Sequence, residues 1–111
     1  MSGHEGFHYE IEKSTDPATG TATTTIHCHG RLVATTANGL KDLVKPIIPE
    51  GGHIVLDFAD LAYMDSSGLG TLVGLKATAV KEGYCRLILE NLTPRVKELL
   101  SLTNLLGMFS S

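Results

Sequence analysis

The clearest signal in this chain is Met64-Asp65-Ser66-Ser67-Gly68-Leu69-Gly70. An apolar run at 53–58 precedes it, and a helix-like run from Ser66 to about Lys81 follows. Asp65 and Ser66 are both residue types that cap the free N–H groups at the start of a helix. We therefore expect a short polar loop between a buried strand and a helix, where rigid supports can present a hydroxyl to a partner.

Small residues recur along one side of the expected helix. Ser66, Gly70 and Gly74 are four residues apart, and Thr78 continues the row. Each glycine costs a helix about 1 kcal/mol relative to alanine, so Gly68 and Gly70 in the first turn suggest a close backbone approach. The opposite stripe is predicted to face the core. It consists of Leu69, Leu72, Val73, Ala77 and Val80.

A serine at a helix N-terminus is also a plausible phosphorylation site. A phosphoryl group adds about −1.5 to −2 charges, and the free N–H groups of a helix start tolerate an anion. Asp65 would oppose it by repulsion, so the surface would change while the fold stays intact. Local physics alone favours a simpler interpretation, in which Asp65 and Ser66 only cap the helix and the glycines only fit helix to sheet.

The stretch from Asp60 to Gly70 resembles the signature of the STAS domain of bacterial anti-sigma factor antagonists, also called anti-anti-sigma factors. The likeness extends from about Phe7 to Met108. It implies an α/β STAS fold with a mixed sheet of four or five strands, an N-terminal antiparallel hairpin and helices packed on the sheet. Residues 1–111 would form a single domain.

The resemblance also implies a function. Such a protein binds an anti-sigma factor, which is an ATP-binding serine kinase, and thereby releases a sigma factor. In the family this kinase phosphorylates the serine after the aspartate, here Ser66, and phosphorylation ends binding; Ser67 is the second candidate. The domain would be no enzyme and hold no cofactor or metal. The residues expected to bind the partner are Asp65, Ser66, Ser67, Gly68, Gly70, Gly74 and Arg31.

The chain departs from the family pattern in two places. Many antagonists end their second strand with Gly-Glu-Leu-Asp, where this chain has Gly30-Arg31-Leu32-Val33. Members usually add a short strand and a last helix, whereas this chain stops at Ser111, so we expect a domain that is short at its C-terminus. An apolar patch and a homodimer through it are then hypotheses. The patch residues would be Leu105, Leu106, Met108 and Phe109.

Two other functional classes stay open. STAS domains also serve as accessory or scaffold subunits of transporters and stress-signalling assemblies, and Arg31 and Val33 fit such a role somewhat better. The glycines 68, 70 and 74 resemble a dinucleotide-binding loop. Their spacing is one residue too long for that fingerprint, and the helix is not expected to start at once after the strand. No second motif completes a catalytic arrangement.

Composition narrows the classes further. The 111 residues fit one domain, and a net charge of −3 argues against nucleic-acid binding. The polar start at 1–5 is no signal peptide, and no apolar run approaches the roughly 18 residues of a membrane span. We therefore expect a cytoplasmic protein with no membrane insertion. Cys28 and Cys85 are predicted to be buried thiols, and His27 and His29 share a strand face without an evident metal-ligand set.

The remaining segments predict the order β-β-α-β-α-β-α. The first two strands form a hairpin, of which Phe7–Lys13 is half-buried. Strand–helix–strand units of this length require parallel crossovers, so the sheet is mixed. The expected later segments are a helix capped by Thr35 or Thr36 and closed by Pro46 and Pro49, strands at 54–58 and 86–89, and a helix from Thr93-Pro94.

Overall fold

The computed structural model describes residues 6–83, 85–103 and 107. The predicted order of elements is confirmed, with one 3-10 turn, η2, added between the first helix and the third strand. The elements are β1 (Phe7–Thr15), β2 (Ala22–Leu32), α1 (Ala37–Val44), η2 (Ile48–Glu50), β3 (Gly52–Met64), α2 (Ser66–Glu82), β4 (Cys85–Glu90) and α3 (Pro94–Leu102).

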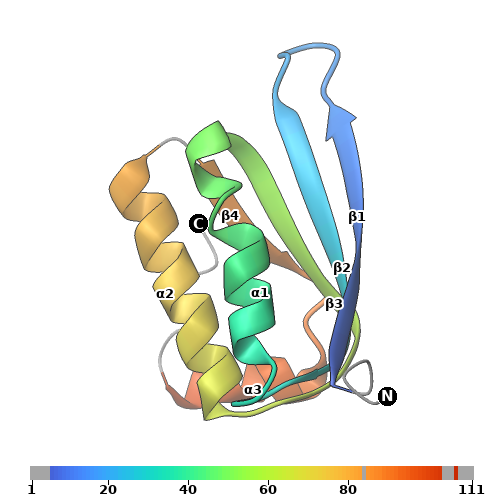
Figure 1. The fold of residues 1–111 in the computed structure, drawn as a ribbon, viewed down its shortest axis with the longest axis vertical. Helices are drawn as coiled ribbons and strands as arrows, with labels where there is room; N and C mark the ends of the chain where they lie inside the picture. The colour runs from blue at the N-terminus through green and yellow to red at the C-terminus, as the bar shows by residue number, and fades with distance from the viewer. Residues whose placement is uncertain (1–5, 84, 104–106, 108–111) are drawn as a thin grey trace.

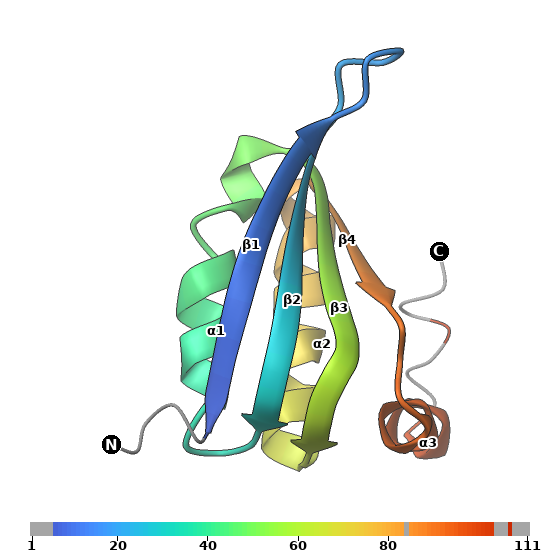
Figure 2. The ribbon, with the colours of Figure 1, turned by 90° about the vertical axis from the view of Figure 1, so that its right-hand side faces the viewer.

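The strands form one mixed sheet in the order β1-β2-β3-β4. β1 and β2 pair antiparallel, while β2 with β3 and β3 with β4 pair parallel. Each parallel pair is joined through a helix, because parallel neighbours need a crossover connection that runs back along the sheet. The predicted mixed sheet with an N-terminal hairpin is therefore confirmed, with four strands in the described part of the chain (Figure 2).

Of the helices that the structure describes, two cover one face of the sheet and the third lies at its end. α1 and α2 lie side by side on one face of the sheet, and α3 lies at the end of the sheet where β3 ends (Figures 1 and 2). The main core fills the space between the sheet and the first two helices, and α3 adds Leu100 from the end of the sheet. The other largest fully buried side chains are Phe58, Ile26, Leu32, Leu40, Ile48, Ile54, Leu56, Met64, Leu72, Leu87 and Val44.

Strand β3 is longer than the sequence suggested. Its apolar run predicts a strand at 54–58, but pairing continues to Met64. The ladder with β2 continues past Asp60 through two register shifts, between His27 and His29 and between Gly30 and Arg31. Only one residue separates β3 from α2, so the expectation of a longer gap before the helix was wrong.

The core-facing stripe of α2 is also rotated from the predicted one. Leu69 and Leu72 are buried as expected, but Ala77 is exposed and Val80 is 67% exposed. The buried positions further along are Leu75, Lys76 and Ala79. Lys76 is only 6% exposed, and its Nζ donates a hydrogen bond of 3.1 Å to the Leu87 carbonyl of β4.

The sheet edge at β1 buries less than predicted. Tyr9 and Ile11 are 44% and 43% exposed, and only Phe7 in this strand is half-buried. β1 lies at the sheet edge and packs mainly against β2, so its apolar side chains have none of the described helices closely packed over them. The predicted half-buried strand therefore exists as a strand but contributes little to the core.

The predicted cap of the first helix differs in the structure. Thr36 precedes α1, but its hydroxyl accepts from the Val33 N–H at 2.9 Å rather than from the helix.

Cys28 is buried and Cys85 half-buried, both as free thiols, and burial raises the pKa of Cys28 to about 12. The C-terminal patch residues, with the homodimer hypothesis, lie outside the described residues. None of the described helices is long and apolar enough to cross a membrane.

Candidate functional site

The start of α2 is held by Asp65. One oxygen of its carboxylate, Oδ1, accepts the backbone N–H groups of Ser67 at 2.9 Å and Gly68 at 3.2 Å. The Asp65 N–H donates to the Leu32 carbonyl at 3.2 Å, which ties the cap to the end of β2. Asp65 and Ser66 were both cap candidates; the structure assigns the cap to Asp65 and puts Ser66 in the first helical position.

Gly68 lets the helix start lie directly on the sheet. A Cβ at this position would collide with the Leu32 carbonyl oxygen and lie 2.9 Å from Cγ of Met64. Real Cβ atoms do not approach other atoms so closely, so the packing of α2 on β2 depends on this glycine. Because Gly68 is buried, we assign it to packing rather than to a partner surface.

The other residues of the stretch face outward. Ser66, Ser67, Gly70 and Gly74 are exposed. A Cβ added at either of the last two glycines would meet no neighbouring atom within 4 Å. The structure thus brings most of the predicted partner-binding residues onto one exposed side of α2, beginning at its N-terminus.

Arg31, the remaining predicted residue, lies beside this site on the sheet. It is paired in register with Tyr63, two residues before the cap. Its guanidinium lies 5.3 Å from the centre of the Tyr63 ring, and that of Arg95 lies 5.9 Å from the same ring. Such cation–π contacts hold arginine side chains over an aromatic face. Tyr63 lies inside the motif at a position to which the motif assigns no role, and Arg95 lies outside it, so the sequence held no signal for either residue.

A family model for the STAS domain matches residues 11–110 of the chain. The chain belongs to the STAS domain family. Among curated relatives, this STAS domain is 32% identical over 80 residues to the anti-sigma-B factor antagonist of Bacillus subtilis (strain 168), and the match covers 72% of each chain. The resemblance noted in the sequence, over Asp60 to Gly70 and from about Phe7 to Met108, is therefore confirmed at the level of the family.

Solved structures show the same fold. The anti-sigma factor antagonist SpoIIAA in its unphosphorylated form is 25% identical, with a TM-score of 0.68 over 88% of this chain and 82% of that one. An anti-sigma factor antagonist from Mycobacterium paratuberculosis is 18% identical, with a TM-score of 0.74 over 99% of this chain and 88% of that one. The second likeness speaks for the fold alone. The Bacillus subtilis relative and SpoIIAA are both named as antagonists.

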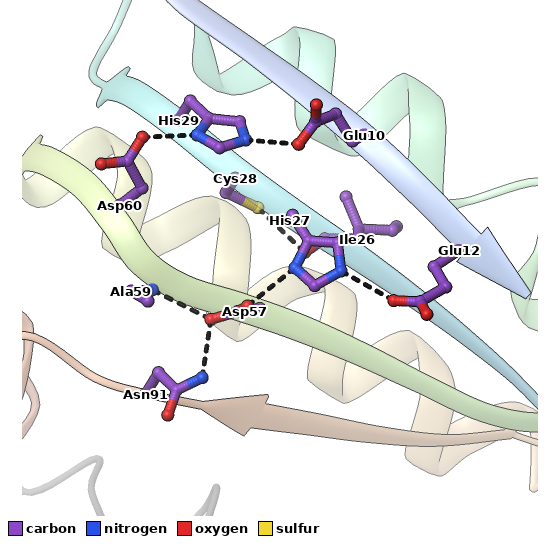
Figure 3. A network of polar contacts seen from close by, with 10 residues as sticks. All are labelled: Glu10, Glu12, Ile26, His27, Cys28, His29, Asp57, Ala59, Asp60 and Asn91. Atoms are coloured by element: carbon purple, nitrogen blue, oxygen red, sulfur yellow. Dashed lines mark hydrogen bonds and ion pairs between the residues drawn. The ribbon is translucent and has the colours of Figure 1, made fainter.

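The open face of this STAS domain carries a second polar cluster, on the side of the sheet away from α1 and α2 (Figure 3). His27 lies between Asp57, at 2.7 Å from Nδ1, and Glu12, at 3.0 Å from Nε2. His29 lies between Asp60, at 2.5 Å, and Glu10, at 3.0 Å. The sequence showed no evident metal-ligand set for this histidine pair and no sign of these partners, because β1 and β3 bring the carboxylates beside each ring from distant positions.

The surroundings of both histidines favour the protonated imidazole. A neutral imidazole has one N–H donor, whereas each ring here faces carboxylate oxygens through both nitrogens. Hydrogen bonds with Glu12 and then Asp57 raise the pKa of His27 above its ordinary value, and bonds with Asp60 and then Glu10 raise the pKa of His29. Burial would raise the pKa of Asp57, but hydrogen bonds from Asn91, the Ala59 N–H and His27 outweigh it and lower that pKa.

The stability of the domain is expected to fall as pH rises through the folded-state pKa values of these histidines. A raised folded pKa means that the stabilisation is complete below the unfolded value of about 6.5 and is lost above the folded value. Urea unfolding between pH 5.5 and 8.5 measures this. The double variant His27→Gln/His29→Gln should give a flatter profile over that range, and matching profiles would refute the assignment.

The side chains of this cluster are not arranged as a set of metal ligands among the described residues. In the described ranges no group of three or more His, Cys, Asp and Glu side chains is placed to hold a metal ion. The geometry explains this, because each imidazole nitrogen already points at its own carboxylate and the two histidines do not converge on a common point. The chains of carboxylate and histidine side chains instead connect β1, β2 and β3 across the sheet.

Proposed function

We propose that this STAS domain is an anti-sigma factor antagonist. It binds an anti-sigma factor that is an ATP-dependent serine kinase, and in doing so frees a sigma factor. Phosphorylation of Ser66 by that kinase ends binding. The relatives named as antagonists support the class, and the exposed start of α2 supports the site. The proposal places the protein in the cytoplasm, where sigma factors act.

The observation that carries the proposal is the division of labour between Asp65 and Ser66. Asp65 supplies the cap bonds to Ser67 and Gly68, so the Ser66 hydroxyl is not needed to hold the helix. It is exposed at the first position of α2, where a kinase can reach it. A side chain that acted only as the cap would be expected to turn back onto the helix N–H groups.

The domain supplies only the acceptor oxygen. In the transfer, the Ser66 Oγ forms a bond to the γ-phosphorus of ATP, the bond to ADP breaks, and the hydroxyl proton passes to a base of the kinase. ATP and Mg²⁺ belong to the kinase. The product places about two negative charges at a helix N-terminus, which tolerates them, and beside the Asp65 carboxylate, which repels them. The expected result is an intact fold with a changed surface.

Arg31 is proposed as part of the same surface. It lies over Tyr63 at the end of β2, next to the strand end whose Leu32 carbonyl holds the Asp65 N–H. A positive side chain at this position favours a partner that is acidic at the matching place. The domain's specificity for its own anti-sigma factor would depend in part on this charge.

The proposal predicts that Ser66→Asp releases the partner while Ser66→Ala keeps it. Each variant, with wild type, serves as bait in a lysate of the source organism, and affinity is then measured with the purified partner. We expect an ATP-binding anti-sigma factor on wild type and Ser66→Ala, with binding at least 100-fold weaker for Ser66→Asp. A loss of that size corresponds to about 2.7 kcal/mol.

A phosphorylation assay separates the two serines. With the captured kinase and ATP, Ser67→Ala should gain one phosphate by mass spectrometry and Ser66→Ala none. If all baits instead hold the same transporter or scaffold subunits, Ser66 has no switching role and the domain is an accessory subunit. If Ser66→Ala is phosphorylated and Ser67→Ala is not, the acceptor is Ser67.

A further inference from the structure

A groove of about 520 Å³ runs between α1 and α2. It begins beside Ser67, the neighbour of the proposed phosphorylation site, and follows α2 toward its C-terminal half. The helices that form it stand side by side on one face of the sheet (Figure 1). The side chains that matter in its walls are Lys41 and Lys45 on one side and Ser67, Gly70, Gly74 and Thr78 on the other.

The shape of the groove follows from side-chain size. Gly70 and Gly74 have no side chain, and atoms added there would meet nothing within 4 Å. A backbone or a narrow side chain can therefore lie against α2. The small residues show that a ligand could lie close to α2 but not what kind of ligand it is. The charges of the groove indicate the kind of ligand.

The charge in the groove has one sign. Lys41 and Lys45 line it, and no Asp or Glu is among the side chains that do. Neither lysine forms an ion pair within 4 Å in the part of the chain that the structure describes. Cations at a helix C-terminus are favoured by the helix dipole, but the pair is four residues apart on one helix, where like charges repel. An anionic ligand would relieve that repulsion.

We propose that the groove binds an acidic segment of the anti-sigma factor. Carboxylates of the segment pair with Lys41 and Lys45, and its backbone lies against Gly70 and Gly74. The inference rests on the proposed function and adds a reason for release. Phosphate on Ser66 would stand near the mouth of the groove, where its negative charge repels the acidic segment at short range.

The test uses charge reversal with a matched control. The groove variant is Lys41→Glu/Lys45→Glu. The control variant, Lys13→Glu/Lys97→Glu, changes the net charge by the same amount, but its two residues lie on β1 and α3, away from the groove. Affinity for the purified anti-sigma factor is measured by calorimetry, with circular dichroism to check folding. The groove pair is expected to weaken binding at least 30-fold and the control pair less than threefold. Lys41→Gln/Lys45→Gln should weaken it about tenfold.

Salt provides an independent readout. Raising the salt concentration should weaken wild-type binding more steeply than binding by the Lys41→Gln/Lys45→Gln variant. Salt screens the ion pairs that the two lysines form with the acidic segment, and the variant does not have those pairs. If the groove variant and the control variant lost affinity equally, or if neither lost any, the groove proposal would be wrong. The proposed switch at Ser66 would not be affected by that result. Failure of wild type to retain any anti-sigma factor would overturn both proposals.

Discussion

Replacing Gly68 with alanine is expected to lower the free energy of unfolding by about 3 kcal/mol, near the upper end of the usual cost of overpacking. The new methyl group would collide with the Leu32 carbonyl oxygen and with the Met64 side chain. The Met64 side chain can shift, but a backbone carbonyl at the end of a buried strand cannot. Urea unfolding followed by circular dichroism measures the loss.

Gly70→Ala is the matched control. The same substitution two residues later meets open space, and alanine is the better helix former by about 1 kcal/mol. Gly70→Ala should therefore raise stability by up to that amount. If Gly68→Ala and Gly70→Ala lowered the free energy of unfolding equally, the loss would come from the helix backbone in general. The close contact of α2 with β2 at Gly68 would then not explain it.

Lys76→Glu is expected to cost about 4 kcal/mol of stability. Lys76 is buried between α2 and β4, and its ammonium group donates to the Leu87 carbonyl. A glutamate would bring a carboxylate against that carbonyl, with no donor to satisfy either and little water to solvate the charge. Thermal and urea unfolding of the variant would both show the change.

Lys76→Met separates packing from polarity in this variant. Methionine keeps most of the apolar stem and loses only the hydrogen bond, so the expected cost is about 1 kcal/mol. An equal loss for methionine and glutamate would mean that the ammonium contact with the carbonyl carries most of the effect. No loss for glutamate would mean that the side chain reaches solvent and is not held as described.

The order of elements could be predicted because it depends on local signals. Thr93 and Pro94 mark the start of α3, where Thr93 accepts the Val96 N–H. The Asp65 cap is a similar local signal, and so is Gly83, which ends α2 in the left-handed conformation. These features involve residues only a few positions apart, so the sequence displays them directly.

Other features depend on how distant segments meet. The buried face of α2 is set by where the helix crosses the sheet, which brought Lys76 inward and left Val80 outside. The carboxylates around His27 come from residues 15 positions before it and 30 positions after it. Their partnership depends on strand register, including its irregularities, and that register cannot be read from one segment alone.

The candidate site was predictable in its residues but not in their roles. The motif located Ser66 and its neighbours, and the structure shows most of them on one exposed side of α2. It suggested a close backbone approach at both Gly68 and Gly70, but only the structure shows that Gly68 meets the Leu32 carbonyl and that Gly70 faces open space. The motif did not reveal the groove either, because Lys41 and Lys45 come from a separate helix that packing sets beside α2.

The sparse burial of β1 has a kinetic consequence. This strand covers little of the core and is joined to the sheet mainly by its backbone ladder with β2 and the two histidine chains. A strand with so few apolar contacts adds little to a folding nucleus, so β1 is expected to dock late, after β2, β3 and the helices have collapsed. In native-state hydrogen exchange, its amides should open in a local step, well below the free energy of global unfolding.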